Sequence, residues 1–369
     1  MAQSLPVDSD PSTKQGRYWI TGRLVSLCLV SLAVTFIAGL IQVSFGTFSM
    51  TVGAAWQTIF DPAVLLSDDA WMAFLVGSEL PEMSRRHLVV WNIRLPRVLV
   101  GILAGATLAV SGSVFQAITR NELASPFVLG VSSGAGFAVL LTLVVFSGLA
   151  PFLPLFAALG GALAFLLVYA IAWKGGTSPV RLVLAGIVVS MVFHSLQQGL
   201  FYLADDLGAV QSAIAWTTGS LTGADWSQVR IALLPGVGAI ALSLLGARQL
   251  NLLLLGDRTA KSLGMRVETV RFGMAGVAIL AASTAIAVAG IVSFVGLVVP
   301  HIVRTIVGSD YRRLMVGCVF AGPALVVTAD VIARLALSPI QVPVGVVTGL
   351  IGGPYFLYLM RRQQSMGDL

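Results

Sequence analysis

The sequence predicts an all-α membrane protein with about ten transmembrane helices, and its composition, its apolar runs and its length all lead to this fold class. Of the 369 residues, 57% are hydrophobic and 10% are charged, which is more apolar surface than one water-soluble core can bury. Uninterrupted runs such as VSLCLVSLAVTFIAGL differ from the alternating segments of about ten residues that form β-barrels. Each helical crossing needs roughly 20 apolar residues, so the chain has room for about ten.

Each expected helix corresponds to one apolar run. Pro96 and Pro126 mark the starts of the second and third, because proline is well accommodated in the first helical turn. The eighth is the shortest and carries Pro300 and His301 near its end. Between the first two helices, Phe45 to Ile93 is expected to hold a short surface helix instead of another crossing. In chain order, the expected helices cover residues 23–45, 95–117, 126–148, 152–173, 180–203, 229–247, 268–289, 292–307, 314–336 and 343–361.

The charge distribution predicts a multi-pass protein of the cytoplasmic (inner) membrane with both ends in the cytoplasm. Most of the 22 lysines and arginines then fall in inner loops, while the outer loops hold many of the 16 acidic residues. The basic excess is not gathered on one face, so no nucleic-acid partner is expected. We therefore predict a cytoplasmic tail over residues 1–22, a ten-helix domain over 23–361 and a second cytoplasmic tail over 362–369.

A short internal similarity links two of the expected helices. LAVSG at residues 108–112 resembles IAVAG at residues 286–290, and the predicted topology gives the two helices opposite directions. This pattern is typical of inverted repeats, whose interface in many transporters surrounds the substrate path. Chance similarity among alanine, valine and glycine is the alternative.

The sequence lacks the HExxH signature of zinc hydrolases and the phosphate-binding loop of nucleotide-binding proteins. It contains no HExxH and no GxxxxGK[ST], and its three histidines are far apart. Cys28 and Cys318 both lie in apolar runs, where free cysteine behaves as a small hydrophobe. We expect no catalytic residue, no metal site and no bound cofactor in this chain, so energy from ATP would have to come from another polypeptide.

A few charged residues lie at the ends of the apolar runs. Arg94 and Arg97, with Arg334 as a third outer arginine, form a candidate clamp for carboxylates of a docking protein, although such side chains also reach lipid headgroups. Asp330 and Arg334 are four residues apart, a spacing that predicts a pair on one helix face. The alternative role for Asp330 is a proton relay in a proton-coupled secondary carrier.

Two inner segments have candidate roles in gating and partner binding. The loop RNELASP, from Arg120 to Pro126, is either a solvated turn or the closure of a pathway. The longer segment from Leu250 to Arg271 combines a leucine run with Gly256 and Gly264, which predict two short helices. Such a segment lies on the membrane surface or binds a groove on a soluble subunit, and its length and leucines favour a partner.

Five motifs in order resemble the permease family of the ABC importers for iron-siderophore, haem and vitamin B12, over about residues 90–360. The resemblance implies the type II importer fold, in which a ten-helix subunit dimerises around a central path with one ATPase beneath each copy. The motifs are RLPR at 94–97, RNELASPFVLGVSSGAG at 120–136, LGDRTAKSLG at 255–264, FVGLVVPHIVR at 294–304 and VPVGVVTGLIGGPYF at 342–356.

The resemblance also implies roles for particular residues. The family's docking arginines correspond to Arg94, Arg97 and Arg334, and its cytoplasmic gate corresponds to Asn121 and Leu123. Its coupling helices, at about 250–266, correspond to the segment that contains Gly256, Asp257, Ala260 and Gly264. Two positions depart from the family pattern: Glu122 replaces a proline of the gate loop, and Gln341 replaces a common glutamate. These departures leave the tightness of the gate and the role of that carboxylate open.

The expected cargo is an iron(III)-siderophore, with haem and cobalamin as alternatives within the family. Met191 and His194 lie at helical spacing and would suit haem, although packing is the commoner role for such residues. The implied partners are ABC ATPase subunits, which would hold ATP and Mg²⁺, a substrate-binding protein, a second permease copy or a related chain, and the lipid bilayer.

Overall fold

The apolar runs fold into helices in the computed structural model, which describes residues 19–367 except 46, 47, 49, 175, 203–206, 338 and 339. No strand occurs in this described part of the chain. Most of the predicted amino-terminal tail, residues 1–18, lies outside it, as do Leu369 and Asp368 of the carboxy-terminal tail. The predicted all-α membrane fold is confirmed.

Ten helices correspond to the ten predicted crossings. Seven are long and apolar enough to span a membrane, and three shorter apolar helices complete the set. The second is a continuous helical segment that begins about ten residues earlier than predicted. The long helices are α1 (Gly22–Ser44), α5 (Arg85–His87) with η2 (Leu88–Arg94) and α6 (Leu95–Thr119), α8 (Leu153–Ala172), α9 (Pro179–Phe201), α11 (Trp226–Leu245), α14 (Val267–Ala289) and α16 (Tyr311–Leu335). The shorter ones are α7 (Val131–Val145), α15 (Val295–Val307) and α17 (Val344–Gly367).

Local backbone geometry explains where the predicted boundaries were wrong. The third helix begins at Val131 instead of Pro126, because Gly130 has φ +82°, a conformation that interrupts a helix. The eighth begins only after Phe294, which also has a positive φ of 65°. The extra helix α10 (Leu207–Thr218) lies in a predicted outer loop, and α17 continues as far as Gly367.

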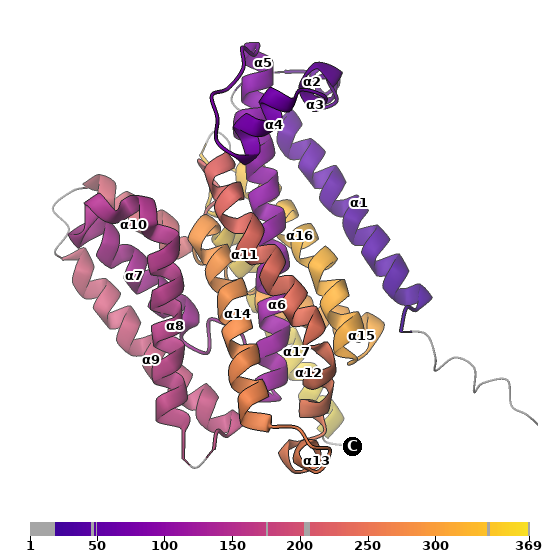
Figure 1. Cartoon of the computed structure of the whole chain (residues 1–369), viewed down its shortest axis with the longest axis vertical. Coiled ribbons are helices and arrows are strands. Elements are labelled where there is room, and N and C mark those ends of the chain that lie inside the picture. The colour runs from indigo at the N-terminus through magenta and orange to yellow at the C-terminus, as the bar shows by residue number, and fades with distance from the viewer. Residues whose placement is uncertain are drawn as a thin grey trace, which may run out of the picture.

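Helix α6 is the centre of the bundle and packs against α11, α14, α15 and α16 (Figure 1). Of its most apolar stretch, 83% is buried, against 28% for α1. A Cβ at Gly112 would lie 1.8 Å from the carbonyl oxygen of Gly296, so α6 and α15 touch through their backbones. Small residues at such contacts are typical of helix packing in membranes. Helices α7, α8 and α9 form a second group beside this centre.

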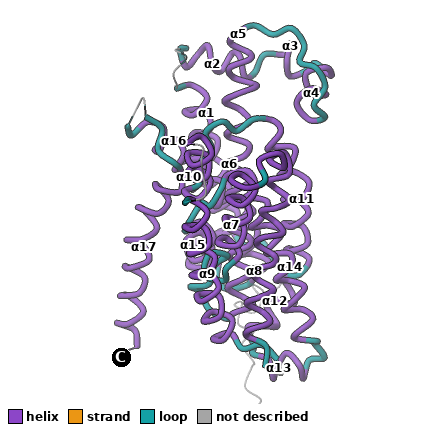
Figure 2. The backbone as a smooth tube through the Cα atoms, turned by 90° about the vertical axis from the view of Figure 1, so that its left-hand side faces the viewer, coloured by secondary structure: helices purple, strands orange, loops and turns teal. Residues whose placement is uncertain are grey.

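The bundle has two distinct ends. We call the end with α2 (Val52–Ile59), α3 (Pro62–Leu65) and α4 (Asp68–Leu75) the outer end, and the end with α13 (Asp257–Ser262) the inner end. Where one short surface helix was predicted between Phe45 and Ile93, the structure has three short helices, α2, α3 and α4. Helix α6 runs from the outer to the inner end and α14 runs back, so the two similar segments lie on antiparallel helices. Helix α1 begins and α17 ends towards the inner end, and α17 stands along one side of the bundle (Figure 2).

The outer helices are joined to the bundle by aromatic side chains. Phe74 of α4 stacks on Trp226 of α11 with ring centroids 4.7 Å apart and on Trp91 at 5.6 Å. The Trp226 indole donates to the carbonyl of Trp91 over 2.7 Å. Beside this cluster, hydrogen bonds from the Ala63 amide and from His87 hold the pKa of Asp61 below its ordinary value. The first outer segment is thus a packed cap on the bundle.

Candidate functional site

Arg97 and Asp330 form a buried ion pair at the outer end. The Arg97 guanidinium donates from Nε and Nη2 to the two carboxylate oxygens of Asp330, over 2.8 and 2.9 Å. The side chains are 9% and 1% exposed, and Gln42 of α1 also donates to Asp330. The predicted pairing of Asp330 with Arg334 is wrong, because the close packing of α6 on α16 brings Arg97 opposite the carboxylate. Asp330 is therefore the counter-charge of a buried arginine on a neighbouring helix.

Arg94 and Arg334 both donate to the last turn of α1. Arg94 is buried and donates to the carbonyls of Val43 and Ser44, which satisfies acceptors that the end of a helix leaves unpaired, and to the Phe48 carbonyl beyond the helix. Arg334 is half-buried and donates from Nη1 to the carbonyl of Gln42 over 3.0 Å. The three predicted docking arginines therefore converge at one place, with Arg334 the most exposed of them.

Gln341 connects this cluster to the loop before α11. Its Oε1 accepts from Arg97 Nη1 over 2.9 Å and from the Thr222 hydroxyl over 3.1 Å. In this chain Arg97 is held by one carboxylate and one neutral acceptor.

The predicted gate loop at the inner end is a compact turn. Asn121 Oδ1 accepts from the Leu123 amide over 2.9 Å, and the Asn121 carbonyl accepts from the Ala124 amide over 3.1 Å. Arg120, which ends α6, has φ +47° and turns the chain out of the helix. This turn fixes Asn121 and Leu123 at the inner end of α6.

Glu122 ties this loop to α15. Its carboxylate lies 3.0 Å from Arg304 Nη1, without hydrogen-bond alignment, and 3.4 Å from His301 Nδ1. Arg304 Nη2 donates to Gln116 of α6 over 3.0 Å. Glu122 therefore gives the loop an ionic contact with a neighbouring helix.

The predicted coupling residues surround one short helix beside the gate loop. The two short helices expected here are α12 (Ala247–Leu254) and α13. Asp257 begins α13 and lies 3.5 Å from Arg120 Nη2, and a Cβ at Gly256 would lie 3.3 Å from Arg120 Nη1. Ala260 is fully buried and Gly264 follows the helix with φ +83°. The element therefore contacts the residue that precedes Asn121.

Arg271 is a structural centre of the inner end that the motif comparison missed. It is 1% exposed and donates to Asp257 over 2.9 Å, to Glu268 over 2.9 Å and to the Thr177 hydroxyl over 2.8 Å. Glu268 also accepts from the Tyr169 hydroxyl over 3.0 Å. The sequence signal was a Glu–Arg pair three residues apart at the start of an apolar helix. These contacts join α13, α14, α8 and the loop before α9.

Comparison with known proteins identifies the family of this chain. The family model described as the FecCD transport family matches residues 32–362. The chain is 37% identical over 333 residues to the Fe(3+)-citrate import system permease protein YfmD of Bacillus subtilis, covering 90% of this chain and 95% of that protein. It is 40% identical over 282 residues to the hemin transport system permease protein HmuU of Yersinia pestis, covering 75% and 84%.

A solved structure extends the likeness to the fold. A metal-chelate type ABC transporter in an inward-facing conformation aligns with a TM-score of 0.76 at 26% sequence identity, covering 92% of this chain and 99% of that chain. The same helices therefore occur in the same order over nearly the whole length. The chain belongs to the FecCD transport family.

Proposed function

We propose that this chain is the transmembrane permease subunit of an ATP-driven ABC importer that carries an iron(III) chelate, first an iron(III)-siderophore, into the cytoplasm. The match to the FecCD family over residues 32–362 carries this proposal. Relatives named as permeases for Fe(3+)-citrate and iron(3+)-hydroxamate support the class of cargo. The chain itself makes and breaks no covalent bond, and hydrolysis of ATP belongs to a partner.

At the outer end, Arg94, Arg97 and Arg334 serve docking of a substrate-binding protein. Arg94 and Arg334 donate to the end of α1, and Arg97 is bound to Asp330, which also accepts from Gln42 of α1. This proximity supports one shared surface, and the charge of the arginines suits carboxylates on the partner. Arg334 makes the first contact because it is the most exposed of the three. Arg94 and Arg97 hold the surface in shape through their bonds to α1 and α16.

At the inner end, Gly256, Asp257, Ala260 and Gly264 receive the movement of the ATPase, and Asn121 with Leu123 closes the exit. The contact of Asp257 and Gly256 with Arg120 supports this assignment, because the coupling element then touches the gate loop directly. A second copy of the chain, or a related permease, completes the path.

Reconstitution tests the function. The chain is placed in liposomes with its ATPase and binding protein, and uptake of radiolabelled ferric citrate, a ferric hydroxamate and hemin is measured with ATP and with a non-hydrolysable analogue. Uptake of an iron chelate that needs both the ATPase and hydrolysis supports the proposal. Uptake without the ATPase that follows a pH gradient would support a secondary carrier instead.

The measurement of hemin uptake tests the main alternative cargo, because one relative of 40% identity is named as a hemin permease. Preference for hemin over both ferric chelates would keep the importer mechanism and change the substrate.

Docking is tested with Arg334→Gln, because charge reversal at the buried Arg94 or Arg97 would disturb the fold as well. Affinity for the binding protein at low salt is expected to fall, since screening is weakest there. Arg312→Gln, at an exposed arginine of the inner end, is the matched control. Equal affinities for the wild type and Arg334→Gln at low salt would remove Arg334 from the docking surface.

A further inference from the structure

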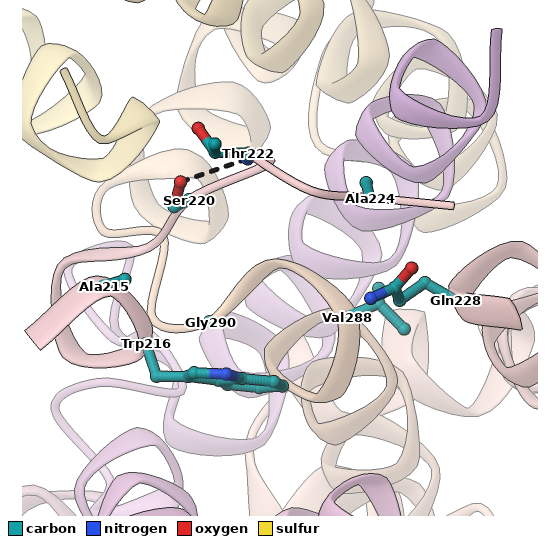
Figure 3. Close-up of a pocket in the computed structure, with 8 residues that line it drawn as sticks. All are labelled: Ala215, Trp216, Ser220, Thr222, Ala224, Gln228, Val288 and Gly290. Atoms are coloured by element: carbon teal, nitrogen blue, oxygen red, sulfur yellow. Dashed lines mark hydrogen bonds between the residues drawn. The ribbon is translucent and has the colours of Figure 1, made fainter. Parts of the chain in front are cut away.

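A polar cavity of about 90 Å³ lies between the end of α10, the loop before α11 and the end of α14 (Figure 3). None of its lining side chains carries a charge. The volume accepts a group the size of a carboxylate but not a whole chelate. The cavity is lined by Ala215, Trp216, Ser220, Thr222, Ala224, Gln228, Val288 and Gly290.

The walls of this cavity are fixed by backbone hydrogen bonds between distant segments. The Trp216 carbonyl accepts from the Ile291 amide over 2.8 Å, and the Ser220 amide donates to the Ala289 carbonyl over 2.9 Å. Gly290 has φ +68°, and a Cβ there would lie 2.4 Å from the Trp216 carbonyl oxygen. Only glycine fits this contact, so the cavity is a built feature of the fold.

Three hydrogen-bond donors line the cavity without an acceptor in the part of the chain that the structure describes. Gln228 Oε1 accepts from the Asp225 amide over 2.7 Å, which leaves the Gln228 amide nitrogen on the cavity side. The Ser220 oxygen accepts from the Thr222 amide over 3.1 Å, so its proton is available. The third donor is the Trp216 indole N–H. A ligand that presents acceptor oxygens would satisfy all three.

The cavity is joined to the outer arginine cluster. Thr222, on its wall, donates from its hydroxyl to Gln341, which also accepts from Arg97. A chelate released by a protein docked at the outer end would therefore meet this cavity near the start of its path.

We propose that Trp216, Ser220 and Gln228 bind outward-facing oxygen atoms, carboxylate or hydroxamate, of the transported iron chelate. This proposal rests on the proposed function and names the chemistry by which its cargo is recognised. The three donor residues are half-buried and their donors are open to the cavity, so oxygen atoms of the chelate would take the place of solvent as hydrogen-bond acceptors. Neutral donors hold an anion less tightly than an arginine does, which allows the chelate to move on.

The test compares two substitutions that preserve shape. Gln228→Glu keeps the oxygen that caps Asp225 and replaces the cavity donor by an anionic acceptor, and Trp216→Phe removes the N–H while keeping an aromatic ring. Thr217→Val is the control, since the Thr217 hydroxyl donates to the Ile214 carbonyl and does not line the cavity. The probe is ferric citrate, and its equilibrium binding to the detergent-solubilised permease–ATPase complex is measured together with uptake into liposomes.

We expect the dissociation constant for ferric citrate to rise roughly three- to tenfold in Trp216→Phe and more in Gln228→Glu. Wild-type affinity in both variants would overturn the assignment, as would an equal loss in Thr217→Val. If the variants lose binding but uptake by the wild type needs no ATPase, the cavity assignment stands and the proposed function is refuted. Normal ATP-driven uptake with unchanged binding in both variants would refute the cavity alone.

Discussion

The buried pair of Arg97 and Asp330 predicts that Asp330→Asn destabilises the folded permease strongly. The substitution keeps the side-chain volume but leaves the Arg97 guanidinium, 9% exposed, without its counter-charge and opposite an amide nitrogen. Removing one member of a buried ion pair costs about 3–5 kcal/mol of unfolding free energy. Replacing both members removes the unpaired charge and restores most of the lost unfolding free energy. The double variant Arg97→Gln, Asp330→Asn is therefore expected to lose much less unfolding free energy than the two single variants lose together.

The assay is reversible unfolding in mixed micelles, followed by circular dichroism for the wild type, the two single variants and the double variant. Thr328→Val is the matched control on α16, because the buried Thr328 hydroxyl oxygen has no partner among the described residues. Its unfolding free energy is expected to stay within about 0.5 kcal/mol of the wild type or to rise. A loss below about 1 kcal/mol in Asp330→Asn, or strictly additive single variants, would refute the reasoning.

Three further predictions concern packing and the inner end. Gly112→Ala forces α6 away from Gly296 and is expected to lower the unfolding free energy by at least about 1–3 kcal/mol in the same assay. Gly273→Ala, with open space at its Cβ, is the control and is expected to be neutral or stabilising. Equal effects of the two substitutions would argue against the close contact. Arg271→Lys cannot serve Asp257, Glu268 and Thr177 together, so it is expected to reduce the ATPase stimulation caused by the loaded binding protein, and unchanged stimulation would remove Arg271 from the inner network. Glu122→Gln is expected to raise the rate of maleimide labelling at Asn121→Cys about two- to fivefold. The factor is modest because the Glu122 side chain is 45% exposed. Glu82→Gln is the control, and an unchanged labelling rate in Glu122→Gln would show that the contact with Arg304 does not hold the loop.

The helices were predictable because each depends on its own run of apolar residues. Ten apolar runs gave ten helices, and the surface helices between Phe45 and Ile93 followed from a segment too polar to cross. The starts of α7 and α15 were not predictable, since they depend on the positive φ of Gly130 and of Phe294. Such conformations arise from packing as much as from local sequence.

Pairing between helices was the part that the sequence did not reveal. The spacing of Asp330 and Arg334 identified a possible local pair, but the partner is Arg97, 233 residues earlier, because α6 packs on α16. Arg271 and Glu268 were visible as charges at the start of an apolar helix, yet their partners Asp257 and Thr177 come from other segments. The donors of the polar cavity all lie within residues 216–228, but the opposite wall, with Val288 and Gly290, comes from the end of α14 and meets them only in the folded bundle.

The most direct measurement of the central claim, that energy enters from an ATPase at the inner end, is sided uptake. Liposomes holding the full complex receive ATP either inside or outside, and labelling of Lys261→Cys with an impermeant reagent establishes which way α13 faces. We predict that ferric chelate is carried only by molecules whose Lys261 faces the ATP, and that it moves towards that side. Transport with ATP on the opposite side, or without the ATPase, would contradict the claim.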